Sequence, residues 1–273
     1  MIINADSAQV YRDLPILSAA PTTAERARAE HRLYGVLDGA LPCSAADWAA
    51  LARGEIDDAH ALGRLPILVG GTGLYLRTLL DGIAPVPPID PNVRDDVRAA
   101  SIEGNYDQLR TLDPESAMRL NPGDSTRIAR ALEVVVSTGK PLAEWQKQRV
   151  GGIGDQIELK PLMLLPPREW LYARCDERFA RMIELGALAE VEALLARNLD
   201  PKLPVMRAIG VREIGSHLRG EVSLEQAIAA GQQATRNYAK RQYTWFAHQP
   251  PEEWPQFREI PDERALELLD VSA

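Results

Sequence analysis

Two short segments hold side chains and backbone groups that could act on a ligand. The first, Asn4-Ala5-Asp6-Ser7, follows a short apolar run and is typical of a strand that ends in a polar loop. Ligands of open α/β sheets bind beyond the carboxyl ends of the strands, so Asp6 is expected to be a carboxylate at the rim of a cleft. The structural alternative is that Asp6 or Ser7 caps the next helix or closes an Asx turn.

The second segment, Gly70-Gly71-Thr72-Gly73, lies between an apolar run at 65–69 and an amphipathic helix expected at 74–81. Glycines let an anion approach the backbone, and the amide groups and dipole of a helix N-terminus favour negative charge. Thr72 adds a hydroxyl donor. The segment therefore indicates a phosphate site or, as the alternative, a tight strand–helix turn without a ligand.

Charge is distributed unevenly along the chain. The net charge of −8 and the sequence pI of about 5.2 argue against a surface coated in nucleic acid. Residues 119–149 and 207–241 are exceptions, because each segment holds six Lys or Arg against three Asp or Glu. These two segments could contact phosphates, or they could be solvated faces of helices.

Basic residues share helix faces in both segments, and in the second an aromatic residue accompanies them. Arg127 and Arg130 are three residues apart, so their side chains are expected to project from the same face of the helix. Lys240, Arg241 and Trp245 lie near the end of another expected helix, where cations could hold an RNA backbone and the indole could stack on a base. The alternative is a solvated face with Trp245 packed in the core.

Breaks in composition divide the chain into two domains. Prolines cluster at 85–91 and glycines at 151–154. Residues 89–152 are therefore expected to form a helical domain, with its clearest helix at 124–138. This domain is expected to be inserted into an α/β core. The core is expected to consist of residues 1–88 and 153–273.

Two further expectations concern the second part of the core. An apolar segment at 157–165, bounded by prolines, predicts another strand. Residues 250–273 are expected to form a weakly ordered tail with a short acidic helix at its end.

Several classes of protein and site are excluded by composition. No apolar run is long enough to span a membrane, so no membrane partner is expected. The two cysteines, Cys43 and Cys175, lie far apart in the sequence and the four histidines are scattered, so no structural zinc site is predicted. The cysteine content fits a reducing compartment, and a cytoplasmic location is expected.

As a whole, the chain resembles the bacterial tRNA dimethylallyltransferases, the isopentenyltransferases that modify the adenosine next to the anticodon. Six segments carry the resemblance and occur in the order and spacing of the family. They are Asn4-Ala5-Asp6-Ser7-Ala8-Gln9-Val10-Tyr11, Leu68-Val69-Gly70-Gly71-Thr72-Gly73-Leu74-Tyr75, Asp90-Pro91-Asn92-Val93-Arg94, Arg127-Ile128-Ala129-Arg130-Ala131-Leu132-Glu133, Arg207-Ala208-Ile209-Gly210-Val211-Arg212 and Lys240-Arg241-Gln242-Tyr243-Thr244-Trp245. One segment would be weak evidence, but six in order span most of the chain.

The resemblance implies a fold and a reaction. The fold is an α/β core with a parallel sheet like that of the P-loop nucleotide-binding (ATP-binding) proteins, and with an inserted helical domain that grips tRNA. The reaction moves a dimethylallyl group from dimethylallyl diphosphate to N6 of adenosine 37, in tRNAs that read codons beginning with U. Mg²⁺ is expected to help diphosphate leave, and the protein is expected to be a monomer.

The resemblance also implies roles for individual residues. Asp6 is expected to be the general base on the adenine amine, with Thr72 and Arg207 at the reaction centre. Gly70, Gly71, Thr72 and Arg207 are expected to hold the diphosphate, and no protein ligand to a metal is assigned. The residues expected to contact tRNA are Asp6, Ser7, Ala8, Gln9, Thr72, Arg94, Thr126, Arg127, Ile128, Ala129, Arg130, Arg207, Arg212, Lys240, Arg241 and Trp245.

The sequence departs from the family in one important respect. The family's phosphate loop, a G-x-x-x-x-G-K-[ST] turn that precedes the Asp6 strand, has no counterpart here. The only Gly-Lys pair, Gly139-Lys140, ends an expected helix and is followed by proline. The first strand, the phosphate loop and the first helix are therefore expected to be missing, through a misplaced start codon or because the chain is a fragment. Such a core is expected to have an unpaired strand edge and exposed apolar surface.

Three other functions remain open on the sequence. A small-molecule kinase of the P-loop class is disfavoured because the Walker lysine is missing. A prenyltransferase that acts on free adenine nucleotides shares the base and the loop, although the inserted helical domain favours tRNA. A non-catalytic RNA-binding remnant is expected to bind tRNA without turnover.

Overall fold

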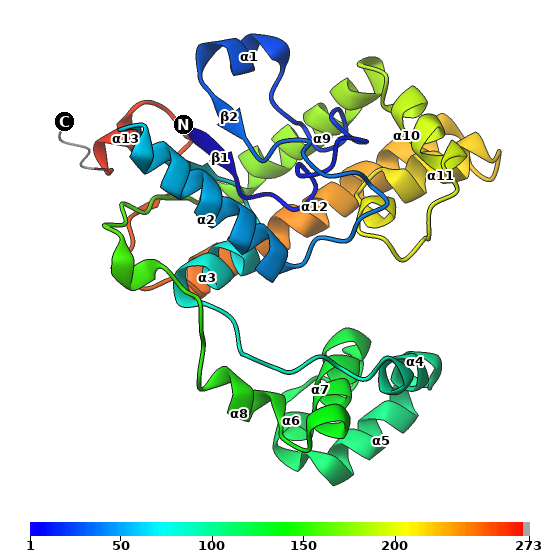
Figure 1. The fold of residues 1–273 in the computed structure, drawn as a ribbon. Coiled ribbons are helices and arrows are strands. Elements are labelled where there is room, and N and C mark those ends of the chain that lie inside the picture. The colour runs from blue at the N-terminus through cyan, green and yellow to red at the C-terminus, as the bar shows by residue number, and fades with distance from the viewer. Residues whose placement is uncertain (270–273) are drawn as a thin grey trace. The chain divides into compact units, whose positions relative to one another are not determined.

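The computed structural model describes residues 1–269 and shows a helix-rich α/β protein (Figure 1). The chain divides into two compact units. Unit 1 comprises Met1–Leu79 and Gln156–Ala273, and unit 2 comprises Leu80–Asp155. None of the described helices is long and apolar enough to cross a membrane.

Unit 1 contains a three-stranded parallel sheet with the order β2-β1-β3. The strands are β1 (Ile2–Asn4), β2 (His31–Arg32) and β3 (Ile67–Val69). Ile2 of β1 pairs with both His31 and Ile67, so the central strand brings its carboxyl end beside that of β3. The predicted strands before Asp6 and before Gly70 are thereby confirmed, and their two polar loops leave the same edge of the sheet.

The outer edge of β3 is the end of this sheet in the described part of the chain. Its side chains Ile67 and Val69 are 47% and 49% exposed, which is unusual for apolar residues of a parallel sheet. A second, two-stranded parallel sheet pairs β4 (Met163–Leu164) with β5 (Gln256–Phe257), and Leu164 is 50% exposed. Both sheets therefore show apolar side chains to solvent.

The second sheet corrects two predictions about unit 1. The strand expected at 157–165 is only two residues long, because its partner is the equally short β5. That partner lies in the tail expected to be weakly ordered, which also contains α13 (Arg264–Glu267). Residues 270–273, the end of this predicted tail, lie outside the described residues.

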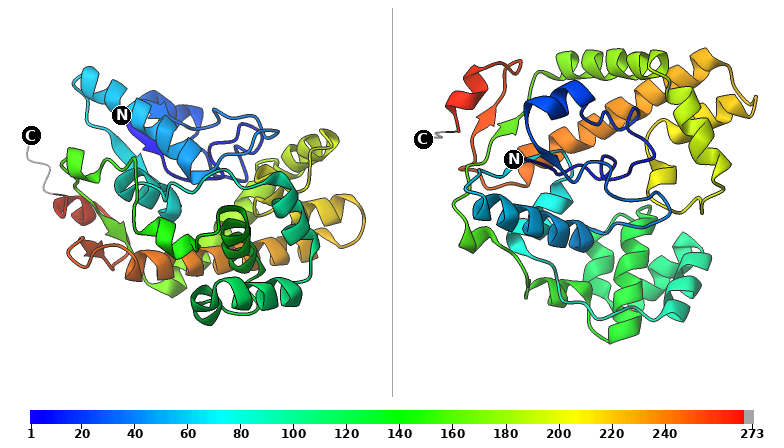
Figure 2. Two further views of the ribbon diagram at one scale, coloured as in Figure 1. Left: turned by 60° about the horizontal axis from the view of Figure 1, so that its bottom comes forward. Right: turned by 45° about the horizontal axis from the view of Figure 1, so that its top comes forward.

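Helices fill the rest of unit 1. The long helices α9 and α12 lie side by side, and α10 and α11 pack at one end of the pair (Figures 1 and 2). A buried cluster that includes Phe179, Val191 and Ile214 joins α9, α10 and α11. The helices are α1 (Thr23–Arg28), α2 (Ala45–Ala61), α3 (Gly73–Asp81), α9 (Arg168–Glu184), α10 (Ala187–Ala196), the 3₁₀ turn η2 (Val205–Arg207), α11 (Val211–Leu218) and α12 (Leu224–His248).

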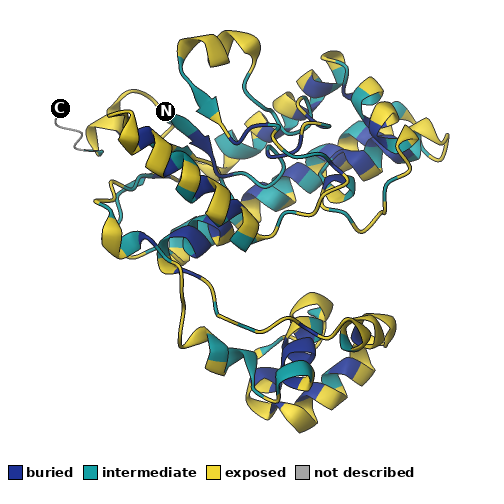
Figure 3. Cartoon of the chain, viewed as in Figure 1, coloured by how far each residue is buried: buried dark blue, intermediate teal, exposed yellow. Residues whose placement is uncertain are grey.

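Unit 2 is a small helical bundle with its own core (Figure 3). Leu109, Ile128 and Leu132 are fully buried where the helices meet. The buried carboxylate of Glu133 is neutralised by Arg98 at 2.9 Å. The helices are α4 (Pro91–Ala99), α5 (Ile102–Leu112), α6 (Pro114–Arg119), α7 (Ser125–Thr138) and α8 (Leu142–Gln146), and the 3₁₀ turn η1 (Gly154–Gln156) follows.

Candidate active site

The loops that follow β1 and β3 are joined by direct hydrogen bonds. The backbone amide of Ser7 donates to Thr72 Oγ1 at 3.0 Å, and the two hydroxyl oxygens lie 3.3 Å apart. The amide of Thr72 donates to the carbonyl of Ala5 at 3.2 Å. A Cβ at Gly70 would stand 2.2 Å from the carbonyl carbon of Ala5, so this approach requires glycine. The two segments predicted to do chemistry therefore form one site.

Asp6 is held in a turn at this site. Its amide donates to Asn4 Oδ1 at 2.8 Å, and Asn4 Nδ2 donates to the Asp6 carbonyl at 2.9 Å. Asp6 Oδ1 accepts the amide of Ala8 at 2.8 Å, which is the Asx turn considered as the alternative. The turn and a catalytic role are compatible, because the turn uses one carboxylate oxygen and fixes the direction of the other.

Helix α12 covers the glycine loop. Gln242 Nε2 donates to the carbonyl of Gly71 at 3.0 Å. A Cβ at Gly71 would meet Gln242 at 2.1 Å, and a Cβ at Gly73 would meet the Trp245 ring at 2.4 Å. The glycines of this loop therefore permit close packing, which is the structural alternative for this segment, and its role as a phosphate site stays a prediction.

Trp245 is half-buried and packs inside unit 1. The guanidinium of Arg77 lies 5.2 Å from the centre of its ring, and Phe246 meets it edge-on at 4.8 Å. These contacts correspond to the structural alternative for Trp245. Its contact with tRNA stays a prediction.

Three tyrosines near Asp6 were not predicted from the sequence as site residues. Burial is the main cause that raises the pKa of Tyr34, Tyr75 and Tyr238, and the nearby carboxylate of Asp6 raises each further. The side chains of Thr72 and Gln242 act in the opposite direction and lower the pKa of Tyr238. Because Tyr238 precedes Gln242 by four residues, helix spacing could have pointed to it once Gln242 was known to face the loop.

The basic residues predicted to bind tRNA fall into both units. Arg207, at the end of η2, and Arg212, Lys240 and Arg241 are exposed on unit 1. The guanidinium of Arg241 lies 5.6 Å from the centre of the Tyr238 ring, so this side chain extends toward the site. The residues predicted in unit 2 are Arg94, Thr126, Arg127, Ile128, Ala129 and Arg130.

Within unit 2, the predicted residues divide by exposure. Arg94, Arg127 and Arg130 are exposed, and Arg127 pairs with Asp124 at 3.2 Å. Ile128 is fully buried in the core, so its side chain cannot touch a ligand and only its backbone is left for that role. The basic side chains of α7 thus stand on the solvent side of a well-packed helix.

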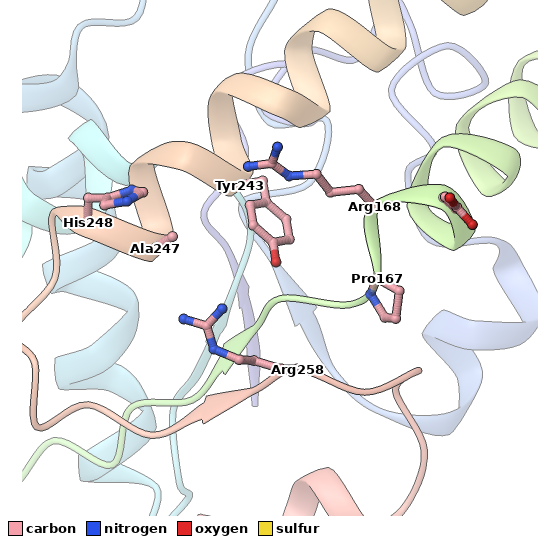
Figure 4. Close-up of a pocket in the computed structure, with 7 residues that line it drawn as sticks. Pro167, Arg168, Tyr243, Ala247, His248 and Arg258 are labelled. Carbon is pink, nitrogen blue, oxygen red and sulfur yellow. The ribbon is translucent and has the colours of Figure 1, made fainter.

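A separate pocket of about 570 Å³ lies beside the second sheet. Pro167 follows β4 and Arg258 follows β5, so the pocket opens near the carboxyl ends of both strands. Figure 4 shows Tyr243 between Arg168 and Arg258, and the Arg168 guanidinium lies 5.0 Å from the centre of the ring. Two arginines against Glu169 make the lining cationic on balance, and His248 also lines the pocket.

Possible ligands for a metal ion are oxygen atoms. Within residues 1–269, no group of three or more His, Cys, Asp or Glu is placed to hold a metal. The hydroxyls of Ser7 and Thr72 are hard oxygen donors 3.3 Å apart, and Asp6 is the residue next to Ser7. Mg²⁺ prefers such donors and usually takes most of its ligands from phosphate and water.

Comparisons with known proteins extend over both units. The family described as IPP transferase matches residues 9–249. The tRNA dimethylallyltransferase of Novosphingobium aromaticivorans is 64% identical over 255 residues, covering 93% of this chain and 91% of that protein. The tRNA dimethylallyltransferase of Sphingopyxis alaskensis is 59% identical over 275 residues, covering 99% of this chain and 90% of that protein.

Solved structures give the same result. The crystal structure of the full-length tRNA isopentenylpyrophosphate transferase from Bacillus halodurans has a TM-score of 0.68 at 31% identity, covering 98% of this chain and 86% of that one. A eukaryotic dimethylallyltransferase captured acting on tRNA has a TM-score of 0.73 at 28% identity, and the match covers 90% of this chain and 63% of that one. The similarity therefore extends over most of the chain.

Proposed function

The chain belongs to the IPP transferase family, and from this premise we propose that it acts as a tRNA dimethylallyltransferase. The dimethylallyl group passes from dimethylallyl diphosphate to N6 of adenosine 37, in tRNAs that read codons beginning with U. The carbon–oxygen bond to diphosphate breaks, a carbon–nitrogen bond to N6 forms, and the amine loses a proton. We further propose a cytoplasmic monomer.

The position of Asp6 carries this proposal. An adenine amine is a weak nucleophile, and a carboxylate within hydrogen-bond distance can take its proton as the new bond forms. Asp6 stands where the loops after β1 and β3 meet, and its orientation is fixed by Asn4 and by the Ala8 amide. The target base must leave the stack to reach this carboxylate.

The diphosphate is assigned to the glycine loop. Gly70 is exposed and Gly71 is half-buried, so part of the loop backbone is open to a ligand, and Thr72 contributes a hydroxyl. Arg207 contributes a positive charge from the same unit. The hydroxyl oxygens of Ser7 and Thr72 fit Mg²⁺ together with phosphate and water oxygens, and the ion would neutralise charge on the departing diphosphate. Thr72 also positions Ser7, so one side chain serves both substrates.

The exposed cations are assigned to the tRNA backbone. Arg212, Lys240 and Arg241 on unit 1 can neutralise phosphates without reading sequence. Arg94, Arg127 and Arg130 on unit 2 can do the same. Base-specific contacts are assigned to Ser7, Ala8 and Gln9 in the loop after β1.

We also propose that the α/β core is a P-loop-like sheet that lacks one strand and its phosphate loop. The exposed Ile67 and Val69 on β3 and the exposed Leu164 on β4 support this proposal. A parallel strand between β3 and β4 would pair with the free edge of β3, pack beside these side chains and join the two sheets. The missing phosphate loop favours a second candidate, in which this chain binds tRNA without turnover.

Nucleoside mass spectrometry tests these two candidates. The chain is incubated with dimethylallyl diphosphate, Mg²⁺ and a tRNA that carries A36-A37-A38, and the digest is searched for dimethylallyladenosine. Product identifies an active transferase that needs no phosphate loop. Bound tRNA without product identifies the binding remnant, and product should then appear when an upstream strand and phosphate loop taken from a relative are added. If neither version binds tRNA, the proposed function is wrong.

A further inference from the structure

Glu190 is a half-buried carboxylate on α10 that the proposed reaction does not use. Its Oε1 accepts the amide of Ile16 at 2.7 Å, and its Oε2 accepts the amide of Leu17 at 2.9 Å. Both oxygens therefore hold consecutive amides of a segment 173 and 174 residues away in sequence. Burial raises the pKa of Glu190, and the two amide hydrogen bonds act in the opposite direction.

The segment held by Glu190 is residues 16–19, here called the 16–19 loop. Ile16, Leu17 and Ala19 pack against the buried cluster of Phe179 and Ile214. Ala19 has a φ of 54°, a left-handed conformation that costs free energy for a residue with a Cβ. Because the loop is strained there, it needs external bonds to keep its shape, and Glu190 supplies two.

The 16–19 loop in turn fixes Gln9. Gln9 Nε2 donates to the carbonyl of Ser18 at 2.9 Å and to the carbonyl of Ala19 at 2.9 Å. A primary amide has two N–H donors, so both are used by backbone acceptors. The amide cannot flip without losing both bonds, and Gln9 therefore presents its Oε1 atom as an acceptor.

We propose that Glu190 is a positioning residue for substrate recognition. It holds the 16–19 loop so that Gln9 offers a fixed acceptor, which selects an N–H donor such as the amino group of a base. This role rests on the proposed function for the identity of the partner, since Gln9 is assigned there to the tRNA. Glu190 itself touches no substrate.

A double-mutant cycle tests the relay through Gln9. Glu190→Gln places an NH₂ group against a backbone amide, and it should weaken tRNA binding about tenfold, roughly the effect of one hydrogen bond to a charged group. Gln9→Ala should have a similar effect. The affinity of the double variant for tRNA should also be only about tenfold lower, because both changes remove the same contact. The affinity for dimethylallyl diphosphate should be unchanged in all three variants.

Glu192→Gln is the matched control, since Glu192 is exposed on the same helix, and it should bind tRNA like the parent chain. The proposal would be overturned if the double variant lost tRNA affinity by the product of the two single losses, or if Glu190→Gln bound tRNA with full affinity. Hydrogen exchange gives a readout that needs no tRNA: the amides of Ile16 and Leu17 should exchange faster in Glu190→Gln and not in Glu192→Gln. Unchanged exchange at these amides overturns the inference even if the proposed function holds. If the parent chain binds no tRNA, the proposed function fails instead.

Discussion

Thr72 Oγ1 accepts the backbone amide of Ser7 at 3.0 Å and so ties together the loops that follow two neighbouring parallel strands. The bond spans 65 residues of sequence. It places a hydroxyl from the glycine loop beside the segment that carries Asp6. The sheet therefore brings the two loops together, and the side chain of Thr72 holds them in contact.

Replacing Thr72 by valine should damage both stability and activity. Valine keeps the shape of the side chain but leaves the Ser7 amide unpaired, and the free energy of unfolding should fall by about 1–3 kcal/mol. Thr72→Ser keeps the oxygen and should stay close to the parent chain. Urea unfolding of both variants measures the difference. Equal stability of the valine and serine variants would show that this bond contributes nothing.

Removing the carboxylate of Asp6 should reduce turnover and spare tRNA binding. Asp6→Ala should slow dimethylallyl transfer by roughly 10²–10⁴-fold, the contribution typical of a general base. Asp6→Asn is the control for the turn, because its amide oxygen can still accept the Ala8 amide. Single-turnover product formation and tRNA affinity are measured on the same samples, with an upstream strand and phosphate loop added if the assay requires them. A parallel loss of binding in both variants would contradict the role as base.

Arg241 should contribute to tRNA affinity through a phosphate. Arg241→Ala should weaken binding, and the slope of log K against log salt should become shallower by about one unit, because one counterion fewer is released. Arg174 is a suitable control, since it is exposed on α9 and paired with Glu177 at 2.7 Å. Binding titrations at several salt concentrations give the slopes. An unchanged slope for Arg241→Ala would rule out the phosphate contact.

The buried Tyr11 should make the fold sensitive to alkali. Burial raises its pKa from the ordinary 10.0 to about 12. Between these values the unfolded chain binds fewer protons than the folded chain, so stability falls as the pH rises through this interval, by roughly 2–3 kcal/mol in full. Tyr11→Phe lacks this loss, and the difference between its free energy of unfolding and that of the parent chain should change between about pH 9 and about pH 11. A constant difference would refute this account.

The parts of the site that the sequence predicts are those set by local patterns. The strand–loop transitions at Asp6 and at Gly70 follow from short apolar runs that end in polar or glycine residues. The contacts of Gln242 and Glu190 could not be predicted, because each reaches a loop more than 170 residues away. The length of β4 was mispredicted for the same reason: its extent depends on β5, a partner in the distant tail.

The open edge of β3 has a practical consequence for handling the protein. A strand edge with free backbone groups and exposed branched side chains, here Ile67 and Val69, can pair with the same edge of another molecule. Self-association should therefore rise with protein concentration and appear as growing light scattering. Replacing Val69 by lysine should suppress this scattering by placing a charge on the edge, whereas a lysine at the exposed Leu62, which lies outside the sheet, should not. The protein should therefore be purified and assayed at low concentration, so that the binding and activity measurements report on single molecules.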